Sequence, residues 1–107
     1  MLKIEFYETN DIDDSLLDFA VIISKYQGKF VWCKAKSRHT WELPGGRREN
    51  GEIIADTAKR ELIEETGAIE FDLKQICVYA VVRDERTTYG LIFFADIKNL
   101  VLYPSPK

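Results

Sequence analysis

Apolar runs alternate with turn residues along most of the chain, and a single stretch keeps a helical period. The apolar runs cover residues 2–7, 17–24, 30–33, 76–82 and 91–97. Short runs of this kind, bounded by turn residues, predict strands. Gln27-Gly28 lies between the second and third runs and predicts a hairpin turn. The polar residues 83–88 predict a turn between the last two runs.

The helical stretch lies between residues 52 and 66, which contain neither Pro nor Gly. Asn50-Gly51 precede it as start signals, and Gly67 follows it as a stop signal. At about 100° per residue, one arc of the helix carries Ala55, Ala58, Leu62 and Thr66. Ile63 lies nearly opposite, which predicts that a second side of the helix is also covered. Strands flanking one central helix predict a mixed α/β or α+β domain.

Length and charge narrow the class of protein. The 107 residues suit a single domain, residues 1–107, and the net charge of −3 argues against a nucleic-acid polymer as partner. The N-terminus has neither the basic nor the apolar region of a signal peptide, and no apolar run is long enough to span a membrane. Cys33 and Cys77 lie in apolar runs without zinc-site spacing, which predicts buried structural thiols. We expect a reduced cytoplasmic protein.

Candidate chemistry is concentrated in the C-terminal half of the predicted helix. Glu61, Glu64 and Glu65 share one side of it, where like charges repel and the helix dipole disfavours anions. Mg²⁺, which prefers oxygen ligands, would resolve both conflicts. The alternative is a solvated Glu-rich helix with pairs such as Asp56–Arg60. That alternative leaves the preceding Pro44-Gly45-Gly46 loop and the spacing of the acids unexplained.

The spacing resembles the box of the Nudix hydrolase family, G-x5-E-x7-R-E-U-x-E-E-x-G-U, in which U is aliphatic. The matching residues are Gly46, Glu52, Arg60-Glu61-Leu62, Glu64-Glu65 and Gly67-Ala68. The resemblance implies an α+β fold, an α/β/α sandwich with a mixed β-sheet around the box helix. It also implies structural roles for Gly46, Glu52, Leu62 and Gly67.

The family pattern usually continues with another strand and a closing helix. Here the chain ends on the Pro-rich residues 103–107, so we expect that closure to be missing or short. An uncovered sheet edge would then favour a homodimer or low stability.

The resemblance also implies roles for individual residues. Glu64 and Glu65 would bind Mg²⁺, with Mn²⁺ as an alternative, and the Gly45 carbonyl would be a further ligand. Glu61 would be another ligand or would polarise the attacking water, with Arg60 holding that carboxylate in place. Glu61, Arg60 and Glu64 are therefore the candidate catalytic residues. Glu85, in the predicted turn, is either an additional ligand or base or a plain turn charge.

The substrate is expected to be a nucleoside diphosphate linked to another group. The run Phe93–Ile97 is similar to MutT-type members, which favours an ordinary or oxidised nucleoside triphosphate such as 8-oxo-dGTP. ADP-ribose or a nucleotide sugar is the nearest enzymatic alternative, and an inactive Nudix-fold binding module is the rival from another class. Lys36 and Arg38, with His39, would contact phosphate or remain surface charges. Trp41 is expected to pack beneath the loop rather than to stack a base.

Overall fold

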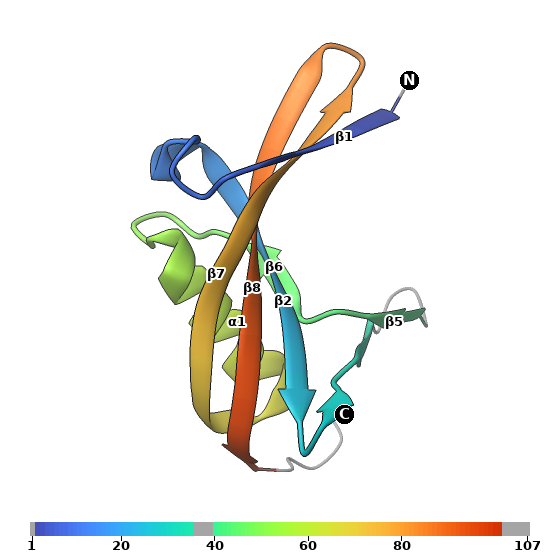
Figure 1. Cartoon of the computed structure of the whole chain (residues 1–107), viewed down its shortest axis with the longest axis vertical. Coiled ribbons are helices and arrows are strands. Elements are labelled where there is room, and N and C mark those ends of the chain that lie inside the picture. The colour runs from blue at the N-terminus through green and yellow to red at the C-terminus, as the bar shows by residue number, and fades with distance from the viewer. Residues whose placement is uncertain (1, 36–39, 102–107) are drawn as a thin grey trace.

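The computed structural model describes residues 2–35 and 40–101. Lys36, Arg38 and His39 therefore lie outside the described residues. The elements, in chain order, are β1 (Leu2–Tyr7), a 3-10 turn η1 (Asp14–Leu16), β2 (Leu17–Tyr26), β3 (Lys29–Phe30), β4 (Cys33–Ala35), β5 (Thr40–Glu42), β6 (Gly45–Arg47), α1 (Ile54–Thr66), β7 (Ala68–Arg83) and β8 (Arg86–Leu100). Figure 1 shows β7 and β8 as a long hairpin that crosses the molecule, with α1 against its lower half.

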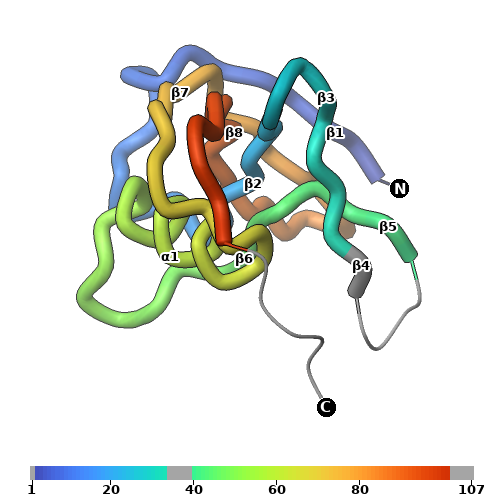
Figure 2. Tube along the Cα trace, turned by 90° about the horizontal axis from the view of Figure 1, so that it is seen from below, coloured from blue at the N-terminus to red at the C-terminus, as the bar shows by residue number. Residues whose placement is uncertain are grey.

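One curled sheet carries most of the strands, in the order β1-β7-β8-β2-β3, and β6 also pairs with β2. The β2–β8 pair is parallel and the other pairs are antiparallel, which confirms the predicted mixed sheet. Strands β4 and β5 form a separate two-stranded ladder. Figures 1 and 2 show this ladder to one side of the sheet and helix.

The helix lies on one face of this sheet and closes the core. Its buried residues Ile54, Ala58 and Leu62 pack with Ile22 of β2 and Phe93 of β8. The α+β class is confirmed, and within the described residues one helical layer of the expected sandwich is present. The part of the chain that the structure describes contains no helix long and apolar enough to cross a bilayer.

The ends of α1 differ in how well local sequence predicts them. Gly67 adopts a left-handed conformation at φ 77° and its N–H donates to the Ile63 carbonyl, so the predicted stop is confirmed. The helix begins at Ile54, after Ile53 as N-cap, later than the Asn50-Gly51 signals indicate. Ile63 is 42% exposed, so the prediction of a second covered side is wrong for this residue.

The β7–β8 hairpin is longer than the apolar runs predict. Its ladder continues to Arg83 and Arg86, and only Asp84 and Glu85 form the turn, both with positive φ. The predicted six-residue turn is wrong because polar residues on the solvent side of a paired strand do not interrupt its backbone hydrogen bonds.

The predicted Gln27-Gly28 turn is confirmed between β2 and β3. The strand expected at 30–33 is wrong in extent. Lys29 and Phe30 pair with β2, and the Val31 N–H still donates to the Ser24 carbonyl at 2.9 Å, while Cys33 already belongs to the ladder with β5.

Candidate active site

The Pro44-Gly45-Gly46 segment is fixed against β2 before it meets the helix. The Pro44 carbonyl accepts a hydrogen bond from the Ile22 N–H at 2.8 Å, and Gly46 lies opposite Ala20 in the ladder. A Cβ on Gly45 would clash with the Ala20 carbonyl oxygen. Glycine is therefore required for this close approach of β6 to β2.

Two glutamates of the box reach this glycine pair from α1. The Gly45 N–H donates to Glu65 Oε1 at 2.8 Å. Glu61 lies so close to Gly46 that a Cβ there would be 2.5 Å from its carboxyl carbon. The turn and the second half of the helix therefore form one site. Glu64 lies at its border, with its side chain 59% exposed and its carboxylate 3.6 Å from Arg60.

Arg60 connects the loop before the helix to the carboxylates. Its Nη1 donates to Glu61 at 2.7 Å, and its Nε and Nη2 donate to the two carboxylate oxygens of Glu52 at 2.7 and 3.0 Å. A further hydrogen bond of 3.1 Å reaches the Arg47 carbonyl. Paired guanidinium–carboxylate contacts fix orientation as well as distance. Arg60 is therefore placed to hold Glu61, while its contribution to catalysis stays a prediction.

Electrostatics divide the glutamates of the box into two kinds. The hydrogen bond from Arg60, helped by the Glu49 N–H, lowers the pKa of Glu52 from 4.5 to about 2. The pKa of Glu65 is raised, first by burial and then by the charges of Glu61, Glu64 and Glu42, although the Gly45 N–H opposes this. The site around Glu65 thus has uncompensated negative charge, which a cation would balance.

The donor set suits a hard divalent cation, since it consists of carboxylates next to a glycine backbone. Within residues 2–35 and 40–101, no three acidic, histidine or cysteine side chains are already gathered around one point. Binding would require Glu64 to turn inward and Glu65 to share or leave the Gly45 N–H. The exposed position of Glu64 permits such a movement.

The pKa of Glu52 leads to a prediction about acid stability. Its ionised form stabilises the fold above about pH 4.5, and this stabilisation is lost as the pH falls towards about 2. We expect Glu52→Gln to lower the melting temperature at neutral pH and to flatten its decline across that interval. Thermal melts of both proteins between pH 7 and pH 2 measure this. Parallel curves for the two proteins would contradict the assignment.

Glu85 is not brought to the box. It lies in the β7–β8 turn, four positions before Tyr89, where β8 begins to pair with β2. Figure 1 shows that turn at the end of the hairpin away from the C-terminal half of α1. The extension of the ladder to Arg86 carries Glu85 outward, which fits a plain turn charge.

The β4–β5 ladder flanks the box and changes two expectations. Trp41 is 66% exposed, so the prediction that it packs beneath the loop is wrong. Cys33 and Cys77 are only partly buried free thiols, less enclosed than predicted. Burial, together with the nearby charges of Glu65 and Glu42, raises the pKa of Cys33 to about 11, which keeps it a protonated thiol.

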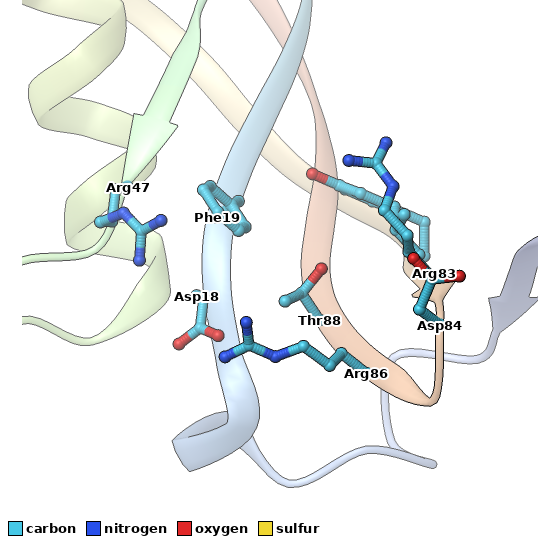
Figure 3. Close-up of a pocket in the computed structure, with 9 residues that line it drawn as sticks. Asp18, Phe19, Arg47, Arg83, Asp84, Arg86 and Thr88 are labelled. Atoms are coloured by element: carbon cyan, nitrogen blue, oxygen red, sulfur yellow. The ribbon is translucent and has the colours of Figure 1, made fainter. Parts of the chain in front are cut away.

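A groove of about 750 Å³ lies on the sheet face opposite the helix. The groove is lined by residues such as Phe19, Tyr79 and Thr88, which alternate along their strands with the buried core residues and therefore point to the other face. Three arginines, Arg47, Arg83 and Arg86, also line it. Figure 3 shows Arg86 extending from β8 toward Asp18.

Sequence reasoning missed this groove. Arg83 and Arg86 are separated by a turn, and only the strand pairing places them side by side. Arg47 belongs to the box segment but has no fixed identity in the pattern. Its guanidinium carbon lies 4.7 Å from the centre of the Phe19 ring, which positions it at the groove.

The fold and the site together define a class of domain: a mixed sheet with a glutamate-bearing helix anchored behind a Pro-Gly-Gly turn. The sequence model of the NUDIX domain matches residues 15–101. The chain therefore belongs to the Nudix family, whose members generally use a divalent metal.

Two curated relatives illustrate the similarity. The putative 8-oxo-dGTP diphosphatase YtkD of Bacillus subtilis is 37% identical over 79 residues, which cover 74% of this chain and 49% of YtkD. An RNA pyrophosphohydrolase of Vibrio cholerae is 33% identical over 66 residues, 62% of this chain and 38% of that protein. The chain thus spans about half or less of the length of these relatives.

Solved structures agree with the fold. The Bacillus subtilis pyrophosphohydrolase BsRppH superposes with a TM-score of 0.81 at 29% identity, covering 95% of this chain and 63% of that one. The Ap4A hydrolase of C. elegans superposes with a TM-score of 0.62 at 19% identity, over 82% of this chain and 75% of that one. The latter is similar in fold alone.

Proposed function

We propose that this domain hydrolyses a phosphoanhydride bond in a nucleoside diphosphate linked to a further group, with Mg²⁺ as cofactor. The observation that carries the proposal is the meeting of Glu61 and Glu65 with the Gly45-Gly46 pair, while Glu64 lies exposed beside them. Crowded carboxylates of this kind destabilise a helix unless a cation compensates them. A domain that only binds nucleotides has no need of this crowding.

Each residue of the site has a part in the proposed reaction. Bound Mg²⁺ would neutralise phosphate charge and lower the pKa of a coordinated water. Glu64 and Glu65, with the Gly45 carbonyl, would hold the cation. Glu61 would accept the proton of the attacking water or complete the metal site, and Arg60 keeps its carboxylate oriented through the 2.7 Å hydrogen bond. Positioning and electrostatic stabilisation then supply most of the rate enhancement.

The first candidate substrate is a nucleoside triphosphate, ordinary or oxidised, with 8-oxo-dGTP as the leading example. The similarity to YtkD, described as a putative 8-oxo-dGTP diphosphatase, supports this choice. The second candidate is the 5′-triphosphate end of an RNA. Its support is the similarity to RNA pyrophosphohydrolases and the groove, where Arg47, Arg83 and Arg86 outnumber Asp18 and Asp84 in a chain of net charge −3.

The test is a product-release assay on nucleoside triphosphates, 8-oxo-dGTP, ADP-ribose, a nucleotide sugar and a 5′-triphosphorylated RNA. We expect turnover of at least one triphosphate with Mg²⁺, its loss with EDTA and its recovery with Mg²⁺ or Mn²⁺. Cleavage of ADP-ribose or the nucleotide sugar alone would replace the proposed substrate class. Nucleotide binding without turnover of any substrate would instead identify an inactive binding module.

A further inference from the structure

The first strand of the chain forms a long free edge of the main sheet. Among the strands that the structure describes, β1 pairs with β7 alone, so its other edge has no strand beside it. It has six residues, whereas β3 and β6, at the opposite edge of the sheet, have two and three. A free edge offers backbone N–H and C=O groups to a further strand, and proteins usually keep such edges short or blocked. β1 is not short and contains no proline.

Apolar and charged residues alternate along β1, so its two faces differ. Leu2, Ile4 and Phe6 point to one face and are 52%, 55% and 66% exposed. Their partners in the β7 ladder are the groove residues Arg83, Val81 and Tyr79. Lys3 and Glu5 point to the other face, where they form an ion pair of 3.2 Å along the strand. Exposed apolar side chains beside a free edge form a surface that favours association.

The sequence of β1 is self-complementary about Ile4. Two copies related by a twofold axis through this residue would pair antiparallel, with Ile4 opposite the same residue of the partner. Leu2 would then lie opposite the partner's Phe6, and Lys3 would lie opposite the partner's Glu5. The symmetry repeats both pairs. Each apolar side chain therefore meets an apolar one and each charge meets its opposite, and cross-strand pairs of both kinds stabilise a sheet.

The charges favour this register over its neighbours. A twofold axis at Lys3 or at Glu5 would place that charge opposite its own copy, and like charges directly opposite each other destabilise a strand pair. An axis between two residues would place apolar side chains opposite charged ones, because the two kinds alternate. An axis nearer either end of β1 would pair fewer residues. The axis at Ile4 avoids all three losses.

We propose that β1 pairs with β1 of a second copy of the chain, in the antiparallel register centred on Ile4, and joins the two sheets. One strand from each copy makes a small interface, so the association is reversible and depends on concentration. An axis perpendicular to the sheet leaves each face on its own side, so the grooves of both copies open on the same face. The pairing is independent of the proposed hydrolase activity.

Sedimentation velocity at several protein concentrations tests the pairing and its register. We expect a monomer–dimer equilibrium for the parent chain. Lys3→Glu and Glu5→Lys each place like charges opposite each other, and each should raise the dissociation constant at least about tenfold. A mixture of these two variants has opposite charges in both pairs, so it should form a heterodimer about as tightly as the parent forms its dimer.

Two further variants supply the controls. Lys74→Glu makes the same charge change at an exposed residue of β7 outside the β1 ladder, and it should dimerise like the parent. The double variant Lys3→Glu/Glu5→Lys exchanges the two charges and should also dimerise like the parent. Thermal melts of all these proteins show whether each is folded before its association is compared.

The axis itself is tested by Ile4→Lys, which places two positive charges directly opposite each other. Because Ile4 is 55% exposed, we expect a folded monomer at every concentration. A parent chain that stays monomeric, or a mixture of the two single charge variants that associates no more than its components, would overturn the proposal. A dimer that both single charge reversals leave unchanged but Phe6→Ala disrupts would assign association to the apolar face of β1, and would also overturn edge pairing.

Discussion

Replacing Glu65 with Gln is expected to lower kcat by roughly a thousandfold, because a metal ion contributes several kcal/mol of charge stabilisation and each 1.36 kcal/mol is about a factor of ten. Gln keeps the shape of the side chain and can still accept the Gly45 N–H hydrogen bond, which is 2.8 Å in the parent. What it removes is the charge that would hold the proposed cation. The Mg²⁺ concentration needed for half-maximal rate should rise as well.

The Glu65→Gln substitution should reduce activity without reducing the stability of the fold. Burial and the charges of Glu61 and Glu64 raise the pKa of Glu65, so its ionised form is disfavoured in the metal-free protein. The melting temperature of metal-free Glu65→Gln is therefore expected to equal or exceed that of the parent. Glu70→Gln, an exposed strand residue outside the box, is the matched control and should keep its activity. A Glu65→Gln enzyme with the parent's rate and Mg²⁺ dependence would remove Glu65 from the site.

Features encoded by neighbouring residues could be predicted from the sequence. The stop of the helix at Gly67 depends on one residue that tolerates a left-handed conformation, and that property is independent of tertiary context. The common side of Glu61 and Glu65 follows from helical spacing alone. Both are local relations, and the structure retains them.

Features that depend on distant pairing could not be predicted in the same way. The parallel contact of β2 with β8 joins residues about 70 positions apart and leaves no periodic signal within either strand. That contact creates the groove with Arg47 and Arg86. The length of the β7–β8 ladder, which is also set by strand pairing, places Glu85 away from the box. The exposure of Trp41 follows from the separation of the β4–β5 ladder from the main sheet, which the apolar pattern does not encode.

The close packing of Gly46 against Glu61 leads to a second large effect. In Gly46→Ala the new Cβ would lie 2.5 Å from the carboxyl carbon of Glu61, so that carboxylate must turn away. Its 2.7 Å hydrogen bond with Arg60 would then lengthen or break. Displacement of a catalytic group by about 1 Å costs on the order of a hundredfold in rate, and we expect kcat to fall by that amount.

Substitutions at two other glycines distinguish this effect from a general loss of stability. In Gly45→Ala the Cβ meets the Ala20 carbonyl of the backbone, which cannot turn away, so the main loss should be stability, by about 1–3 kcal/mol. Gly28→Ala has no heavy atom within 4 Å of its Cβ and should cost only about 1 kcal/mol for its left-handed φ, with normal kcat.

A double-mutant cycle tests the cause. If Gly46→Ala acts through the carboxylate, it should cost almost nothing further in kcat when Glu61 is already Gln and inactive. Thermal melts of the same four proteins keep folding separate from catalysis. Additive losses of kcat in the double variant would mean that Gly46 acts on the reaction by another route. If both substitutions acted only through the Glu61 carboxylate, the second one would have no further effect on kcat.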